Sequence, residues 1–142
     1  KGVDTVSKVM FTSKATAKGG REGHVKSDDG LIDLDLVDGA SDKEGSNPEQ
    51  LFAAGYAACY DGALNLMAQK DNKDIDSTIT AEVSLMKDES DDGVKIGVVL
   101  NIEIKGVSQE EAEELAEKAH GFCPYSKATR GNIDVELKAK AV

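Results

Sequence analysis

The sequence contains no tryptophan, and aromatic residues make up only 4% of its 142 residues. A core built from such a chain must be mainly aliphatic. Basic residues are also in short supply: 17 Lys and Arg stand against 27 Asp and Glu, which gives a formal net charge of −10. Nucleic acids and anionic membrane surfaces both require a basic face on their partner. The charge balance therefore argues against both kinds of partner.

Long apolar runs are absent as well. No stretch approaches the roughly 20 apolar residues that cross a bilayer, and residues 1–20 lack the apolar core of a signal peptide. We therefore expect no membrane insertion and a cytoplasmic location. The chain length suits a single domain. We divide it into N-terminal strands and a loop (1–46), a central helix (47–70) and a C-terminal part of strands and a second helix (71–142).

Cysteine is limited to Cys59 and Cys123. Neither belongs to a Cys-x-x-Cys pair, so zinc or thioredoxin-type chemistry has no support, and we expect no bound metal or cofactor. In a cytosolic protein such residues are more often catalytic, redox-active or incidental than a structural disulfide. Cys59 lies in an apolar run, where burial raises the pKa of a thiol and makes it inert.

The second cysteine precedes Pro124, and this pair predicts a short helix that begins at the proline. Cys123 would then lie at or near the N-cap, where free backbone N–H groups favour a thiolate. The alternative is a small residue that fills a turn. The local sequence leaves both interpretations open.

Glycine-rich and polar turns separate extended segments in the first third of the chain. Residues 28–30 (DDG) predict the turn of a hairpin within residues 23–37. Gly19-Gly20 indicates a further turn beside Arg21. Residues 38–47, rich in Gly, Ser and Asp, predict a loop.

A helix start follows this loop. Asn47 is a favoured N-cap, Pro48 suits the first helical position, and Gln50 can complete a capping box. The helix should run to about Gln69 and is apolar on nearly all faces, so we expect it to be buried on most sides. A chain this short has difficulty surrounding such a helix alone, which favours a partner subunit.

The remaining sequence carries strand and helix signals in turn. Apolar residues at period two predict strands within residues 77–87, 94–104 and 132–142. Ser108 and Glu111 form the capping box of a second helix. Its narrow apolar stripe consists of Ala112, Leu115, Ala116 and Ala119. Together these segments predict an α+β fold.

Two long motifs then carry a family resemblance. NPEQLFAAGYAAC (residues 47–59) and CPYSKATRGNIDVEL (residues 123–137) closely resemble the organic hydroperoxide resistance (Ohr) branch of the OsmC/Ohr family, and GGREG (residues 19–23) matches its N-terminal arginine loop. The resemblance extends over nearly the whole chain. It implies an OsmC/Ohr-like fold of antiparallel sheets wrapped around buried central helices, in an intertwined homodimer with active sites at the subunit interface.

The same resemblance implies a thiol-dependent peroxidase that reduces organic hydroperoxides to alcohols. By position, Cys59 corresponds to the peroxidatic cysteine and Cys123 to the resolving cysteine. Arg21 and Glu49 correspond to the pair that activates the peroxidatic thiol. The usual reductant of the family is a lipoylated protein, which supplies a dithiol. Two alternatives remain: an OsmC-like peroxidase of broader substrate range, and a redox-sensing or lipid-binding module without turnover.

An alkyl hydroperoxide requires an apolar pocket. The aromatic and aliphatic residues near the two motifs supply candidates for its walls: Leu51, Phe52, Tyr56 and Phe122. Such residues equally suit an ordinary core.

Helix geometry constrains the activating pair. On one straight helix, Glu49 and Cys59 would lie about 15 Å apart along the axis, too far for one Arg21 guanidinium to bridge. We expect the helix to break or bend at Gly55. The alternative is that the three groups do not all come from one chain.

The effect of three further polar residues depends on where they lie in the fold. Asp61 lies two residues after Cys59, where a carboxylate opposes thiolate formation if it faces the pocket and is harmless if it faces away. His120 lies at a helix C-terminus, which favours the cationic form. His24 fits a surface strand.

Overall fold

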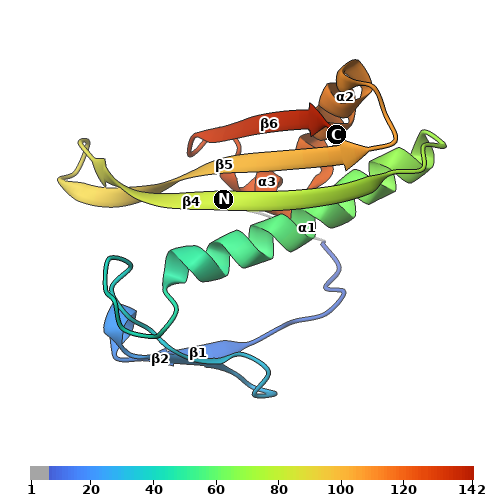
Figure 1. Cartoon of the computed structure of the whole chain (residues 1–142). Coiled ribbons are helices and arrows are strands. Elements are labelled where there is room, and N and C mark those ends of the chain that lie inside the picture. Colours follow the sequence, from blue (N-terminus) through green and yellow to red (C-terminus); the bar gives the residue numbers. More distant parts are fainter. Residues whose placement is uncertain (1–6) are drawn as a thin grey trace. The chain divides into compact units, whose positions relative to one another are not determined.

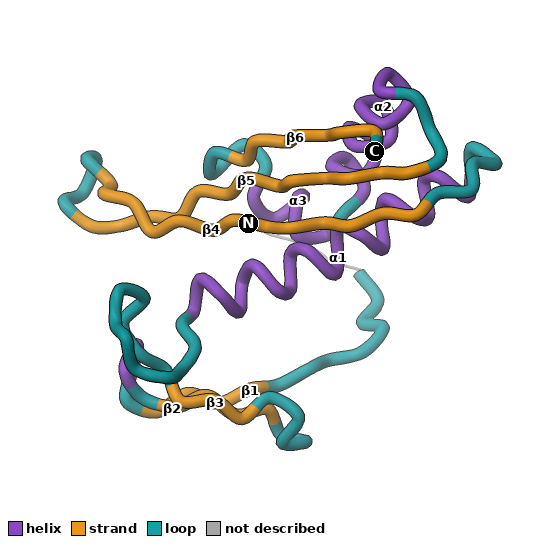
Figure 2. Tube along the Cα trace, in the orientation of Figure 1, coloured by secondary structure: helices purple, strands orange, loops and turns teal. Residues whose placement is uncertain are grey.

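The computed structural model describes residues 7–142, which form two compact units with a boundary after Pro48 (Figures 1 and 2). The first unit contains β1 (Ala15–Lys18), the 3-10 turn η1 (Gly20–Glu22), β2 (His24–Ser27) and β3 (Asp33–Asp35). The second contains α1 (Pro48–Lys70), β4 (Asp76–Asp88), β5 (Gly93–Lys105), α2 (Gln109–Phe122), α3 (Pro124–Thr129) and β6 (Val135–Ala141). The boundary lies close to the expected division at residue 46. The single domain expected from the sequence stays a prediction.

The first unit is a three-stranded antiparallel sheet in the order β1-β2-β3. The predicted hairpin is confirmed, with His24 paired to Asp35 across β2 and β3. Gly30 takes a φ of 76°, a left-handed conformation that glycine adopts without strain, and this closes the turn. Only Leu36 and Ser46 are buried among residues 7–48. This sheet therefore has almost no core of its own.

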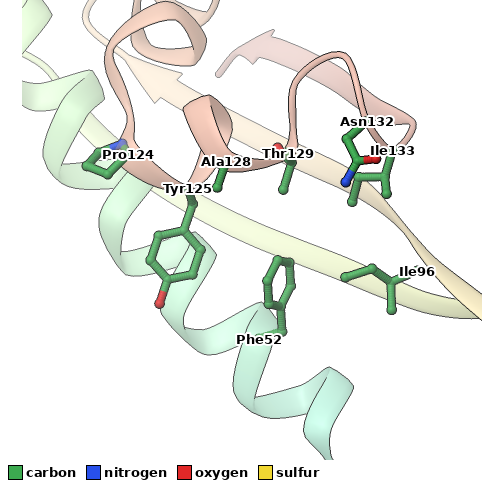
Figure 3. Close-up of a pocket in the computed structure, with 8 residues that line it drawn as sticks. All are labelled: Phe52, Ile96, Pro124, Tyr125, Ala128, Thr129, Asn132 and Ile133. Carbon is green, nitrogen blue, oxygen red and sulfur yellow. The ribbon is translucent and has the colours of Figure 1, made fainter. Parts of the chain in front are cut away.

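Helix α1 is continuous over 23 residues and shows no kink in Figure 1, so the expected break or bend at Gly55 is wrong. Glycine is required at this position for a different reason: a Cβ here would lie 2.5 Å from Oη of Tyr125. Figure 3 shows the Tyr125 ring beside α1. Gly55 therefore permits a close approach between α1 and the segment after Cys123, and the helix stays straight.

The α1 helix buries one face within this chain. That face consists of Tyr56, Tyr60, Ala63, Leu64 and Ala68. The small residues Ala54, Ala58 and Gly62 are exposed on another side. The expectation of burial on most sides is therefore not met within one copy of the unit.

The second sheet has the order β4-β5-β6. Strands β4 and β5 form a long antiparallel hairpin, whereas β5 and β6 are parallel. The expectation of antiparallel sheets is wrong for this pair. The reason is the connection: α2 and α3 lie between the two strands in the sequence and carry the chain back to the starting end of β5, as in other parallel crossovers (Figure 1).

Helix α2 has the predicted start. The Ser108 side chain accepts from the Glu111 backbone N–H, and the Glu111 side chain accepts from the Ser108 N–H. Its whole predicted stripe is buried: Ala112, Leu115, Ala116 and Ala119. The apolar face of β5 adds Val98, Leu100, Ile102 and Ile104 to the same core. This core of the second unit holds α1, α2 and the sheet together.

Candidate functional site: two cysteines beside an apolar cavity

The two cysteines come together in the second unit. Cys59 projects from α1, and Cys123 lies at the junction of α2 and α3, where it is the C-cap of one helix and the N-cap of the other. Both are free thiols; Cys123 is fully buried and Cys59 partly buried. Cys59 packs against the buried cluster that contains Cys123, and the two thiols are close enough for Cys123 to raise the pKa of Cys59. The predicted helix start at Pro124 is thus confirmed, and it brings the second cysteine to the first.

Opposing influences act on the Cys59 thiol. Burial raises its pKa, and the adjoining Cys123 raises it further. The backbone N–H of Tyr125, directed at the Cys59 sulfur, lowers it. The N–H group at the start of α3 therefore acts on Cys59, whereas the Cys123 side chain makes no capping hydrogen bond. Tyr125 is not among the site residues predicted from the sequence; its position directly after the helix-starting proline was the available signal.

Helix α3 is anchored to α1 by buried hydroxyl groups. Ser126 Oγ and Tyr56 Oη lie 2.8 Å apart, and Tyr56 Oη lies 3.1 Å from Thr129 Oγ1. Ser126 Oγ also lies 2.8 Å from Nδ1 of His120. Tyr56 and Ser126 are completely buried. These bonds fix the turn that follows Cys123 against the helix that carries Cys59.

His120 lies in the last turn of α2 as expected, but its surroundings oppose the cationic form, contrary to the prediction. Burial lowers the pKa of this imidazole, and the nearby Arg130 guanidinium lowers it further. Arg130 donates a hydrogen bond of 2.8 Å to the His120 carbonyl, so the arginine takes the place at the helix C-terminus that the histidine was expected to fill.

An apolar cavity of about 510 Å³ adjoins the start of α3. Its walls are Phe52, Ile96, Pro124, Tyr125, Ala128, Thr129, Asn132 and Ile133, drawn in Figure 3. Of the predicted pocket residues, Phe52 is part of these walls. Tyr56 lies in the buried core, and Leu51 is half-buried outside the walls.

Phe122 lies at the surface, 42% exposed. The Nζ atoms of Lys70 and Lys127 lie 5.4 and 5.5 Å from the centre of its ring. These distances are within the range of cation–π attraction. The ring is thus flanked by cations and is not among the walls of the apolar cavity.

The carboxylate of Asp61 faces β4. Its Oδ1 accepts hydrogen bonds from Ser77 Oγ at 2.6 Å and from Asn65 Nδ2 at 3.1 Å. Two residues along a helix correspond to a rotation of about 200°, which places Asp61 on the side opposite Cys59. The harmless orientation of Asp61 is therefore the one that the structure contains.

The predicted activating residues lie at the ends of their elements. Arg21 is part of η1 in the first unit, and Glu49 lies in the first turn of α1. Because α1 is straight, Glu49 and Cys59 are about 15 Å apart along its axis. The activating role of both residues stays a prediction.

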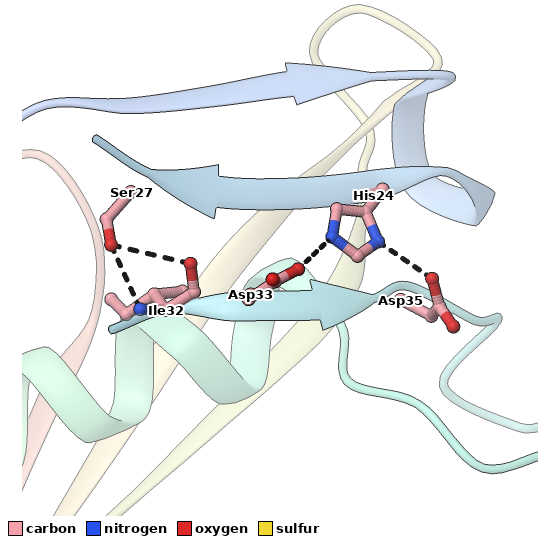
Figure 4. Close-up of polar contacts among 5 residues, drawn as sticks. All are labelled: His24, Ser27, Ile32, Asp33 and Asp35. Atoms are coloured by element: carbon pink, nitrogen blue, oxygen red, sulfur yellow. Dashed lines mark hydrogen bonds and ion pairs between the residues drawn. The ribbon is translucent and has the colours of Figure 1, made fainter. Parts of the chain in front are cut away.

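His24 occupies the surface strand that was expected for it. Its Nδ1 lies 2.7 Å from Asp35 and its Nε2 lies 2.5 Å from Asp33 (Figure 4). Both hydrogen bonds raise the pKa of the imidazole, the one to Asp35 most. The histidine therefore joins two carboxylates of β3 to β2, and both contacts favour its protonated form.

Two structural absences apply to residues 7–142. Within this range, no group of three His, Cys, Asp or Glu side chains is arranged to hold a metal ion. None of the helices in this described part of the chain has the length and apolar composition needed to cross a bilayer.

Comparison with known proteins identifies the family to which this chain belongs. Residues 40–138 match the OsmC-like protein family. Organic hydroperoxide resistance protein OhrB of Bacillus subtilis is 59% identical, over 92% of this chain and 98% of the relative. The chain therefore belongs to the OsmC/Ohr family, and within it to the organic hydroperoxide resistance proteins.

Solved structures agree with this assignment. The crystal structure of B. subtilis OhrB is 58% identical, covers 93% of this chain and 100% of its own, and superimposes with a TM-score of 0.90. A Vibrio cholerae structure with captopril bound in one of the active sites is 34% identical, covers 94% and 96% of the two chains, and has a TM-score of 0.82. Both similarities extend over nearly the whole chain.

Proposed function

We propose that this protein is a thiol-dependent peroxidase that reduces organic hydroperoxides to alcohols. The observation that carries the proposal is the proximity of two free thiols, Cys59 and Cys123, next to a helix whose Pro124 and Tyr125 also line an apolar cavity. The relatives named for organic hydroperoxide resistance support the same chemistry.

The reaction proceeds in two steps: the hydroperoxide oxidises Cys59, and Cys59 then forms a disulfide with Cys123. The Cys59 thiolate attacks one oxygen of the O–O bond, which breaks; the alkoxide leaves and takes a proton to become an alcohol, and the sulfur becomes a sulfenic acid. The Cys123 thiol then condenses with the sulfenic acid to form a disulfide and water. A dithiol reductant, which we propose to be a lipoylated protein, reduces this disulfide and is itself oxidised.

Cys59 requires a cation for the first step. Burial raises the pKa of its thiol, and a single backbone N–H offsets only part of that effect. Arg21 is the proposed cation, because its guanidinium can pair with a thiolate and a carboxylate at once. It would also stabilise the leaving alkoxide.

The straight α1 helix limits which copy of the chain can supply Glu49 to the site at Cys59. Glu49 cannot share one guanidinium with the Cys59 of its own helix, since about 15 Å separates them along the axis. We therefore propose that Glu49 of one copy acts at Cys59 of a second copy. The exposed face of α1, with Ala54, Ala58 and Gly62, lets a second helix approach closely, and this supports a homodimer.

The cavity indicates the class of substrate. Its walls are almost entirely apolar, which suits an alkyl or fatty-acyl hydroperoxide better than hydrogen peroxide. The V. cholerae relative holds captopril, a small organic molecule, in one of its active sites. Two cysteines that cycle between thiol and disulfide suit a reducing compartment, so we propose a cytoplasmic location.

Peroxide consumption by the reduced protein tests this function. The protein is mixed with cumene hydroperoxide or with hydrogen peroxide, and turnover is followed with dihydrolipoamide as the dithiol. We expect rapid turnover of the organic peroxide and slow turnover of hydrogen peroxide. Absence of turnover with both peroxides would contradict the peroxidase function and leave a redox-sensing or lipid-binding module. Equal rates would favour a peroxidase of broader substrate range.

A further inference from the structure

The turn after Cys123 is held in place by a set of buried polar contacts that the proposed chemistry does not use. Ser126 is completely buried, and its Oγ lies 2.8 Å from both Tyr56 Oη and His120 Nδ1. Thr129 Oγ1 adds a second contact to Tyr56, at 3.1 Å. Displacing α3 would leave these groups unpaired in the core, which is costly. The network therefore favours one position of α3 against α1.

Gly55 completes the fit from the side of α1. A Cβ at this position would lie 2.5 Å from Oη, 3.1 Å from Cζ and 3.2 Å from Cε2 of Tyr125. The ring has little room to retreat, because its centre lies 5.8 Å from that of Phe52 and 5.5 Å from that of Tyr56. Only glycine allows the Tyr125 ring to lie directly on the helix surface.

This close packing has a consequence at the sulfur. Gly55 and Cys59 are four residues apart, so they lie on the same face of α1. Tyr125 meets both residues: its ring covers Gly55, and its backbone N–H is directed at the Cys59 sulfur. A shift of the ring away from Gly55 would therefore carry the N–H away from the sulfur.

We propose that Gly55 and Ser126 are positioning residues for Cys59: together they hold Tyr125 so that its backbone N–H donates to the thiolate. The inference rests on the proposed role of Cys59 as the peroxidatic cysteine. A hydrogen bond to the charged form of a group favours that form, and the thiolate is the nucleophile. Loss of either positioning residue should therefore leave Cys59 in place and lower the fraction that is ionised.

The pH dependence of Cys59 alkylation tests this directly. In a Cys123→Ser background the reacting thiol is unambiguous, and iodoacetamide labelling is followed by mass spectrometry from pH 6 to 10. Adding Gly55→Ala should raise the apparent pKa of Cys59 by about one unit, which is about tenfold less thiolate at neutral pH. The control is Gly121→Ala, a helical glycine whose Cβ would meet nothing within 4 Å, and it should leave the profile unchanged.

Two further variants keep the test decisive. Adding Tyr125→Phe to Gly55→Ala removes the nearest clashing atom and should restore most of the original profile. Ser126→Ala should raise the apparent pKa of Cys59 independently of Gly55. If circular dichroism shows that Gly55→Ala is not folded, the Ser126→Ala result alone tests the proposal. Folded Gly55→Ala and Ser126→Ala proteins with the profile of the Cys123→Ser background would overturn the proposal.

The alkylation assay contains no peroxide, so it separates this inference from the proposed function. An unchanged pKa in the variants refutes the positioning roles alone. Absence of peroxide turnover in the unaltered protein refutes the peroxidase function alone.

Discussion

The two units bury their apolar residues to very different extents. In residues 7–48, large apolar side chains such as Phe11 and Leu31 are 82% and 87% exposed, and Leu36 is the one buried apolar residue. In the second unit, helices α1 and α2 and the sheet meet in a continuous apolar core that includes Leu64, Leu100 and Leu115. Apolar burial is the dominant stabilising contribution in folding. The second unit therefore has the means to fold around its own core, whereas the first requires a covering surface.

Because of this difference, the unit that provides the stable core is not the unit that provides every proposed catalytic residue. The second unit holds both cysteines, the cavity and the core. The first unit supplies Arg21 from a short turn between two strands. A unit with little core can carry a catalytic arginine if a larger surface orders it, and the proposed homodimer offers such a surface.

The sharpest test of the second unit concerns its two thiols. Cys59→Ser should abolish peroxide turnover, because the thiol proposed to attack the peroxide is removed. Cys123→Ser should complete one round of peroxide reduction and then stop at the sulfenic or a more oxidised state. Stopped-flow peroxide consumption with mass spectrometry distinguishes the two. Steady turnover by Cys123→Ser would contradict a resolving role.

The corresponding test of the first unit is Arg21→Gln. Removal of the proposed cation should lower kcat/KM for cumene hydroperoxide about a hundredfold, the usual effect of removing one charge-stabilising donor. The urea midpoint should be unchanged, because Arg21 lies in a unit with almost no core. A normal kcat/KM would show that the first unit is not part of the active site.

A pair of leucines tests the difference in burial itself. Leu100→Ala, at a fully buried position of β5, should lower the free energy of unfolding by about 2–5 kcal/mol. Leu31→Ala, at an 87% exposed position, should change it by less than about 0.5 kcal/mol. Urea unfolding measures both. A large loss for Leu31→Ala would show that a second copy covers this residue in solution.

The two histidines should titrate in opposite directions. The pKa of His24 is raised by Asp35 and Asp33, and that of His120 is lowered by burial and Arg130. NMR titration of the two imidazole signals, assigned with His24→Gln, should place one above 6.5 and the other below it. A raised pKa in the folded state means that the His24 contribution to stability is present below pH 6.5 and is lost as pH rises through the folded value. The reverse order of the two signals would contradict the assignment.

The smallest effect concerns acid stability in the second unit. A hydrogen bond from Lys73 and one from the Ser108 backbone lower the pKa of Glu111 to about 2. Its contribution to stability is therefore present above pH 4.5 and is lost as pH falls toward about 2. Glu111→Gln should flatten this part of the pH–stability curve, measured by thermal unfolding between pH 2 and 6. An unchanged curve would show that these contacts do not persist in solution.

The local elements could be predicted from the sequence because their signals are local. The Ser108–Glu111 capping box, the stripe of α2 and the alternation along β5 each depend on neighbouring residues and on one periodicity. The helix start at Pro124 belongs to the same class. The cysteine pair was found through the family motifs, since composition alone indicated an inert, buried Cys59.

The sequence by itself thus determined the elements, the aliphatic core and the candidate thiols of this protein. Tertiary structure decided what depends on distant contacts. From the sequence, Gly55 resembles a helix breaker, but in the structure it makes room for Tyr125. Asp61 could oppose the Cys59 thiolate by its position in the sequence, but in the structure it accepts a hydrogen bond from Ser77 on the far side of α1. The parallel pairing of β6 and the N–H group of Tyr125 at Cys59 follow from where α2 and α3 return the chain. Such placements are set by the packing of whole elements, and no local pattern of residues encodes them.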